Sequence, residues 1–394
     1  MEGAAKMLRK ISFVMMVQVL LIIAGCVSEK SNEQIGELRE PVFEKLISKE
    51  QLDSGELELV WQSIVPMQKS ETIGEMVIIG ERLYVLTSQN FLVSLDRKNG
   101  EPVFSREIGE RGFPVFGLNS YGGELYSVVG NKLTQINEQS GETISEINFD
   151  YGVVCPASRN KDFFYVGGSD KCVHTLKAEN KVEVFKAAAG NGSAITAVMA
   201  DEDFVVFSTD AGDVICMTIA KPQKMWSFRA AGAILAPLVK DADDLYFASK
   251  DTNIYCINLK DGDLKWKYPS GMMPAKAPII TPAYLYENAA EKGVFALDKT
   301  GGKFAWQIED ATGLLAESAG KDYLMTTRLG RTALLVVDSK SGKRINSLNL
   351  AGITSFASNA GDSYIYIADE TGRVACIKPV VRSYTSSAEG VRAR

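Results

Sequence analysis

The sequence is poor in the residues on which many catalytic and metal sites depend. Its 394 residues include one histidine, His174, so no cluster of imidazoles can bind a metal ion, and any Ser–His or Cys–His site would have to use this residue. The six cysteines form no Cys-x-x-Cys pair. The net charge of −6 provides no general basic surface for a phosphate backbone. These absences argue against a histidine-based metal site and against nucleic-acid binding.

The one long apolar run is too short to cross a membrane. It covers residues 11–23 and follows the basic residues Lys6, Arg9 and Lys10. Its thirteen residues would form a helix of about 20 Å, whereas the hydrocarbon core of a bilayer is roughly 30 Å thick. A basic start followed by a short apolar run is typical of a signal peptide, which we assign to residues 1–25.

The end of this signal peptide resembles the bacterial lipobox, because Ile23, Ala24 and Gly25 precede Cys26. The resemblance implies that the chain is cut before Cys26 and that palmitate-type acyl chains are attached there. Two or more such chains hold a protein stably on a membrane. Because Val27 and not an aspartate follows, the resemblance favours the outer membrane, with the protein facing the periplasm. An ordinary signal peptide with a chance cysteine is the alternative.

Residues 26–55 are mostly polar and charged, and we interpret them as a tether. Four apolar residues within them are spaced as on one face of a short helix. These residues are Val42, Phe43, Leu46 and Ile47. Such a helix could pack on the main domain or dock a partner. Residues 381–394 have no apolar pattern, so we expect a disordered tail there.

Between residues 56 and 380 the sequence repeats. Each repeat contains an apolar run followed by a polar turn, at spacings of 40 or 41 residues. The runs with their turns cover residues 92–100, 133–141, 173–181, 214–222, 254–262, 294–302 and 334–342, and an eighth run begins at Val374. A second apolar, aromatic-rich strand lies shortly before each run, at hairpin spacing. Four short strands in about 40 residues are the unit of a β-propeller blade.

The repeats predict an all-β fold, a single eight-bladed β-propeller of four-stranded blades over residues 56–380. The eighth run has no turn and no strand after it, whereas residues 58–62 look like a fourth strand with nothing before it. We expect this N-terminal strand to complete the last blade and close the ring, because an incomplete blade would leave an open sheet edge.

Aromatic residues recur at one position of the repeat, and we interpret them as wedges that bury large areas between neighbouring blades. They are Trp61, Trp226, Trp266 and Trp306. Three cysteines share another position, where they are expected to be small buried residues with free thiols. They are Cys216, Cys256 and Cys376. Cys155 and Cys172 fall on strands of one blade that are not adjacent. The sequence leaves two states possible for this pair, a disulfide or two free thiols.

The best copy of the repeat, Phe295-Ala296-Leu297-Asp298 with Gly302 and Trp306, is similar to the PQQ-like propeller repeat. One subfamily with this repeat consists of quinoprotein dehydrogenases, which bind pyrroloquinoline quinone and Ca²⁺. Another consists of non-catalytic lipoproteins, the BamB subunits of the outer-membrane β-barrel assembly machine. The length, anchor and blade count resemble the second subfamily. The first implies a Ca²⁺ site and usually adjacent cysteines, and this sequence has no Cys-Cys pair.

We therefore predict a monomeric, lipid-anchored propeller that is not an enzyme and that needs neither a cofactor nor a metal ion. Its predicted work is to bind protein partners at the outer membrane. The resemblance implies the β-barrel assembly machine as the partner. A quinoprotein dehydrogenase and a surface-exposed binding lipoprotein are the alternatives. His174 lies in a strand-like run, and we interpret it as a packed or surface residue.

Overall fold

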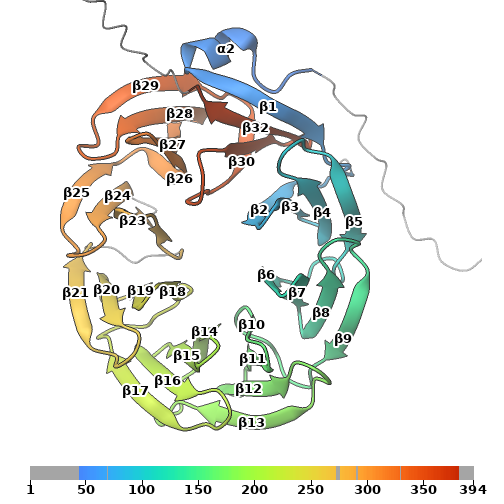
Figure 1. Cartoon of the computed structure of the whole chain (residues 1–394), viewed down its shortest axis with the longest axis vertical. Helices are drawn as coiled ribbons and strands as arrows, with labels where there is room; N and C mark the ends of the chain where they lie inside the picture. The colour runs from blue at the N-terminus through green and yellow to red at the C-terminus, as the bar shows by residue number, and fades with distance from the viewer. Residues whose placement is uncertain (1–43, 69, 272–275, 290–291, 329, 381–394) are drawn as a thin grey trace, which may run out of the picture. The chain divides into compact units, whose positions relative to one another are not determined.

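The computed structural model describes residues 44–380, except 69, 272–275, 290–291 and 329. All of them belong to one compact unit, Leu38–Arg394. Residues 23–26 of the predicted lipobox and the predicted tail 381–394 lie outside the described residues. The described unit is a ring of eight four-stranded antiparallel sheets (Figure 1), which confirms the predicted propeller. Within it, no helix has the length and apolar character that a membrane span requires.

The blades follow one another along the chain, and each runs from an inner first strand to an outer fourth strand. Blade 1 consists of β2 Ile73–Ile79, β3 Arg82–Thr87, β4 Phe91–Asp96 and β5 Pro102–Glu107, and blade 2 of β6 Val115–Tyr121, β7 Glu124–Val129, β8 Lys132–Asn137 and β9 Thr143–Asn148. Blade 3 consists of β10 Ser158–Arg159, β11 Phe163–Gly167, β12 Cys172–Lys177 and β13 Glu183–Ala188, and blade 4 of β14 Ile195–Ala200, β15 Phe204–Thr209, β16 Asp213–Thr218 and β17 Lys224–Arg229. Blade 5 consists of β18 Val239–Asp241, β19 Asp244–Ala248, β20 Asn253–Asn258 and β21 Leu264–Pro269, and blade 6 of β22 Ile279–Ile280, β23 Tyr284–Ala289, β24 Gly293–Asp298 and β25 Phe304–Ile308. Blade 7 consists of β26 Ala311–Ser318, β27 Lys321–Arg328, β28 Arg331–Asp338 and β29 Arg344–Asn349, and blade 8 of β30 Ile353–Ala357, β31 Ile365–Asp369 and β32 Arg373–Pro379 with β1 Leu57–Ile64.

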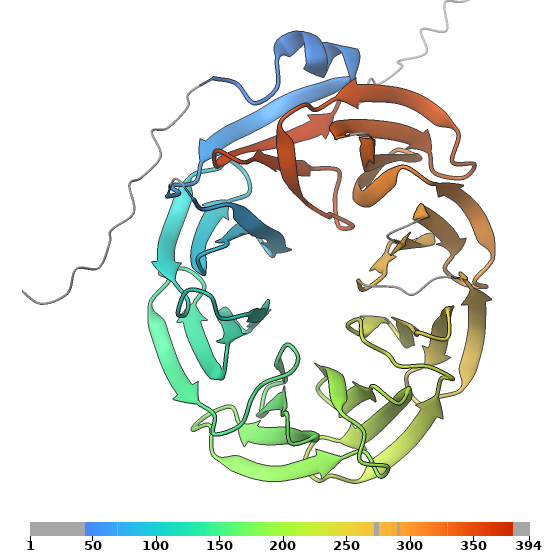
Figure 2. The ribbon, with the colours of Figure 1, turned by 180° about the vertical axis from the view of Figure 1, so that it is seen from behind.

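The N-terminal strand β1 closes the ring, as the sequence predicted. It pairs antiparallel with β32, the last strand of the chain, and Figure 2 shows the two lying side by side in blue and red. Trp61 lies opposite Cys376, just as Trp266 lies opposite Cys256 inside blade 5. The register shifts next to this pair in both blades. The same shift follows in every third-to-fourth strand pair of the ring, so β1 is a regular fourth strand.

At five junctions an aromatic residue of the outer strand fastens one blade to the next through what we call an aromatic–glycine dock. In blade 4 the indole nitrogen of Trp226 donates to the carbonyl of Leu259, 3.0 Å away in blade 5. Gly262 of the same turn lies against the ring, and its φ of +80° suits glycine. A Cβ at Gly262 would lie 2.6 Å from the Trp226 ring, so no larger residue fits without a shift. Equivalent docks join Trp61 to Gly100, Phe104 to Gly141, Trp266 to Gly302 and Trp306 to Gly342.

Three junctions lack this dock, and each lacks it for a different reason. Between blades 2 and 3, Ser145 stands at the aromatic position and Lys181 at the turn position. Between blades 3 and 4, Phe185 is present, but the turn that follows contains Pro222 instead of glycine. Between blades 7 and 8, blade 8 has no such turn, because its fourth strand comes from the N-terminus. These three junctions are therefore built differently from the other five.

A short helix, α2 Lys49–Ser54, occupies the junction between blades 7 and 8. Ser48 caps it in a capping box with Gln51, and Ile47 and Leu52 on either side of the cap are buried in one apolar cluster with blades 7 and 8. Gln51 also donates to the carbonyl of Asn349 on β29 at 2.8 Å. The helix begins later than the apolar spacing suggested, and Val42 and Phe43 lie outside the described residues.

Candidate functional site

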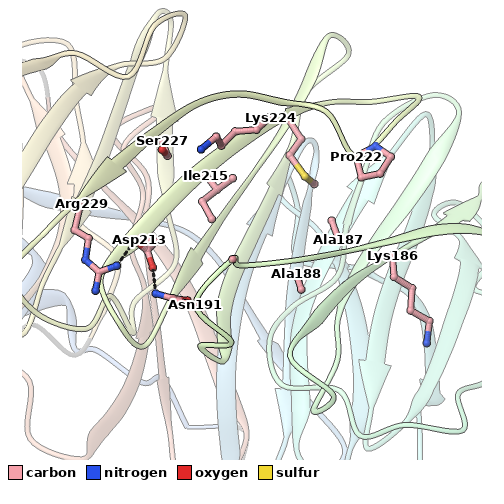
Figure 3. Close-up of a pocket in the computed structure, with 12 residues that line it drawn as sticks. Lys186, Ala187, Ala188, Asn191, Asp213, Ile215, Pro222, Lys224, Ser227 and Arg229 are labelled. Carbon is pink, nitrogen blue, oxygen red and sulfur yellow. Dashed lines mark hydrogen bonds and ion pairs between the residues drawn. The ribbon is translucent and has the colours of Figure 1, made fainter.

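The junction between blades 3 and 4 leaves a groove of about 540 Å³ open at the outer rim of the ring (Figure 3). We call it the blade 3–4 groove. One wall is the end of β13 around Ala187 and Ala188. The other is the face of blade 4, with Ile215 and Met217 from β16 and Ser227 from β17. Its walls thus come from the outer parts of two neighbouring blades.

The groove is open because β13 ends in small residues. Ala187 lies opposite Val173, at the position where the following outer strands carry Phe228 opposite Val214 and Tyr268 opposite Ile254. Those aromatic side chains fill the space between their own blade and the next. Phe228, for example, packs against Phe247 and Tyr255, with ring centroids 5.9 and 5.5 Å apart. A methyl group in their place leaves Ile215 on the face of blade 4 partly exposed, whereas Met217 beside it stays buried.

The missing dock contributes to the same opening. The indole of a tryptophan would donate to the carbonyl of the next turn, but the side chain of Phe185 has no N–H group. The hydroxyl of Tyr165 donates to that carbonyl instead, to Ile219 at 3.2 Å. The turn carbonyl is thus satisfied from within the ring, and the outer rim of the junction is left without an indole to cover it.

Three cationic side chains line the groove. Arg229 lies at one end beside Asp213 and Asn191, Lys186 lies toward the other end, and Lys224 lies between them with its side chain directed toward Ser227 (Figure 3). The Arg229 guanidinium donates to Asp213 at 2.7 Å, and the amide of Asn191 donates to the same carboxylate at 2.8 Å. The only carboxylate lining the groove is therefore already paired. Lys224 has no ion-pair partner among the described residues.

His174 lies at the junction between blades 2 and 3, and its two carboxylate partners, Asp170 and Glu183, also pair with Lys186 of the groove. Its ring is buried and stacks on Tyr151, with centroids 3.6 Å apart. Nδ1 lies 2.6 Å from Glu183 and Nε2 lies 3.0 Å from Asp170. Burial acts to raise the pKa of Asp170, but its hydrogen bond and charge interaction with His174 hold that pKa below the ordinary value. The buried ring thus has both nitrogens in contact with carboxylates of its own blade, which agrees with the packed residue that the sequence predicted.

The structure places the four tryptophans on outer strands of different blades, so they form no common site. The cysteines at the shared repeat position are buried with free thiols, and burial raises the pKa of Cys216, Cys256 and Cys376 to about 12. Cys155 and Cys172 are free as well, which decides between the two states that the sequence left open. Cys26 lies outside the described residues.

The described residues do not fit a Ca²⁺–quinone centre. A hollow of about 450 Å³ lies beside the innermost strands β2 and β30, and Glu75 is the only carboxylate that lines it. In the described ranges, no group of three or more His, Cys, Asp or Glu side chains could hold a metal ion.

Sequence patterns alone did not reveal the blade 3–4 groove. The signal that could have revealed it is Ala187, which stands where the other outer strands have larger side chains, namely Arg106, Ile147, Phe228, Tyr268, Ile308 and Leu348. The second signal is the proline in the turn at Pro222, where five other repeats have glycine. Both departures occur at the junction where the groove lies.

Known proteins resemble the chain mainly in fold. The family model described as outer membrane protein assembly factor BamB matches residues 129–380. The crystal structure of BamB from Moraxella catarrhalis has a TM-score of 0.60 at 14% identity, covering 80% of this chain and 99% of that one. The computationally designed Ika8 protein has a TM-score of 0.63 at 13% identity, covering 81% and 99%. At such identities, the two solved structures show the fold alone.

One protein resembles part of the chain more closely in sequence. Protein Rv3035 of Mycobacterium tuberculosis is 27% identical over 166 residues. The match covers 38% of this chain and 40% of that protein. The chain thus spans less than half the length of this relative.

Proposed function

The chain belongs to the family described as outer membrane protein assembly factor BamB, and on that premise we propose that it is a non-catalytic scaffold that docks other proteins in the cell envelope. The observation that carries the proposal is the blade 3–4 groove. It combines apolar and charged side chains, as protein-binding sites on a rigid scaffold do. It offers no paired nucleophile and base. The work of such a site is binding.

We further propose that the scaffold is held on the outer membrane through acyl chains on Cys26 and faces the periplasm. The sequence before the ring supports this proposal, because the apolar run 11–23 ends in the lipobox-like residues 23–26. Assembly of outer-membrane β-barrel proteins is the process that the family description suggests.

Cross-linking in living cells tests the docking role. A photo-reactive amino acid at Ser227, exposed in the groove, is expected to capture a specific envelope protein. Lys267 provides the matched control, because it is exposed at the same repeat position of β21, directly after Trp266 as Ser227 follows Trp226. Equal capture of the same proteins at both positions would contradict a role for the groove.

A deletion strain tests the process. If the scaffold serves β-barrel assembly, its loss lowers the amounts of folded barrel proteins in the outer membrane, and the full-length gene restores them. Normal barrel levels together with a specific cross-link at Ser227 would keep the docking role and reject the assembly role.

A further inference from the structure

The positions of Lys224 and Arg229 on one strand carry an inference about what the groove binds. In a regular strand, residues five apart point to opposite faces. The register of β17 shifts between the pairs Cys216–Trp226 and Met217–Lys224, so one residue is extra. This bulge returns Lys224 to the face that carries Ser227 and Arg229, and all three line the groove.

The bulge also sets the spacing of the two cations. With one residue taken up by the bulge, Lys224 and Arg229 are about four regular steps apart, or roughly 13 Å along the strand. An extended chain lying along the groove would repeat this spacing between its residues i and i+4, whose side chains point to the same face. Residue i+2 of that chain would then face the middle of the groove.

The middle of the groove is apolar and small. Ile215 and the methyl groups of Ala187 and Ala188 line it, and Met217 lies buried beneath it. These groups suit a branched aliphatic side chain such as valine, because they would remove its surface from water without leaving a polar group unpaired.

The electrostatics favour an acidic occupant. Lys186, Lys224 and Arg229 line the groove, and Lys186 is already paired with Asp170 and Glu183. Asp213, the one lining carboxylate, is bound by Arg229 and Asn191. Arg229 keeps donors for a second carboxylate, because a guanidinium has five N–H groups and its side chain is 60% exposed. The groove is thus locally positive on a protein with a net charge of −6.

We propose that the blade 3–4 groove binds an extended acidic segment of a partner protein, with carboxylates at i and i+4 on Lys224 and Arg229 and an aliphatic side chain at i+2 over Ile215. This inference rests on the proposed docking function and specifies its ligand. The partner is recognised by the spacing of its charges, which complements the bulged strand.

The test measures peptide binding to the purified full-length chain by fluorescence anisotropy. The probe is a rhodamine-labelled Ser-Glu-Thr-Val-Thr-Glu-Ser peptide. One comparison peptide has lysine in place of both glutamates, and a second moves the glutamates to i and i+3. We expect the probe to bind at least about tenfold more tightly than either comparison peptide at low salt, where complementary charges contribute most.

Variants identify the site of binding. Lys224→Glu is expected to weaken binding of the probe about tenfold, because it places a like charge opposite a carboxylate. Lys303→Glu is the matched control, an exposed lysine in the third-to-fourth strand turn of blade 6, and should leave binding unchanged. Ala187→Phe, which restores the bulk found at Phe228, should block the groove.

Three results would overturn the inference: similar binding of the glutamate and lysine peptides, similar effects of Lys224→Glu and Lys303→Glu, or no binding of the probe to the intact chain. Each is distinguishable from failure of the docking role. If the cross-link at Ser227 persists while the peptides fail to discriminate, the scaffold function stands and the acidic ligand is rejected. Loss of the cross-link would reject the docking role itself.

Discussion

The indole nitrogen of Trp61 donates a hydrogen bond to the carbonyl of Arg97 at 2.8 Å, and this contact joins the last blade to the first. Gly100 of the same turn lies beneath the indole, where a Cβ would be 2.4 Å from the ring. The guanidinium of Arg97 in turn donates to the hydroxyl of Tyr366 in blade 8 at 2.9 Å. The closing seam of the ring therefore has the same tryptophan dock as the seams between blades 4 and 5, 5 and 6, and 6 and 7.

Replacing Trp61 should weaken this seam. Trp61→Phe keeps an aromatic ring but leaves the Arg97 carbonyl without its donor, so we expect a loss of about 1–2 kcal/mol in unfolding free energy. Trp61→Ala removes the buried ring and should cost about 3–5 kcal/mol. Chemical denaturation measures both values. Hydrogen exchange should also speed up in β1 and β32, and unchanged exchange there would contradict the role of Trp61 in closure. Trp266→Phe is the control for the same dock within the chain.

Helix α2 should stabilise the ring although it lies outside the blades. Leu52 is buried in the cluster with Leu57 and Leu348, so Leu52→Ala is expected to lower the unfolding free energy by about 2 kcal/mol. Limited proteolysis should then cleave near residue 48 at lower protease concentration. Lys49→Ala, an exposed substitution in the same helix, should change neither measurement. Equal behaviour of the two variants would show that α2 does not contribute to the seam.

Glu287 predicts an unusual dependence of stability on pH. Its side chain is 1% exposed, neither carboxyl oxygen has a hydrogen-bond partner among the described residues, and burial raises its pKa from 4.5 to about 8. Between these two values the unfolded chain releases this proton while the native protein keeps it. The free energy of unfolding therefore falls as pH rises from about 4.5 to about 8. Below pH 4.5 Glu287 is protonated in both states, so its ionisation takes nothing from stability there.

Glu287→Gln removes the ionisable group and should remove this contribution. At pH 8 we expect the variant to be more stable than the parent by roughly 2–4 kcal/mol, with a much smaller difference at pH 4.5. Denaturation at several pH values measures the difference. Glu179→Gln, at an exposed glutamate, should change stability little at any pH. A parent protein whose stability shows the same pH profile as Glu287→Gln would refute the buried, protonated state.

The lipid anchor predicts a change of compartment. Cys26→Ser removes the thiol that would be acylated, so the variant should leave the membrane fraction and lose metabolic labelling with an alkyne-tagged palmitate. Cys172→Ser, at a partly exposed cysteine of the ring, should keep both. A parent protein that carries no palmitate label would point to an ordinary signal peptide, and labelling that persists in Cys26→Ser would place the acyl chains on another residue.

The architecture could be predicted from sequence because it is specified many times over. Each repeat shows the same pattern of apolar strands and polar turns. The ring closure is indicated by two features, the incomplete repeat after Val374 and the unmatched strand around Trp61. Strand pairing then follows from the need to leave no open edge. The structure confirms both the blade count and the closure.

The groove could not be predicted in the same way, because it depends on what is missing at a single junction. The small side chain of Ala187 matters only when compared with Phe228 in space. The bulge that turns Lys224 toward Arg229 leaves no direct mark in the sequence. The start of helix α2 is a different case. Its cap signature, Ser48 with Gln51, was readable, but the apolar spacing that precedes it suggested an earlier helix.

The pairing of β1 with β32 also sets an order of events during synthesis. The first strand of the ring to leave the ribosome has as its partner the last strand to be made, so the ring cannot close until the chain is nearly complete. Until then, the edge of β1 and the apolar faces that flank the seam are exposed, a state in which chains are prone to aggregate. Contacts between such distant segments also slow folding. A ring that closes end to end therefore requires protection while the chain is still growing.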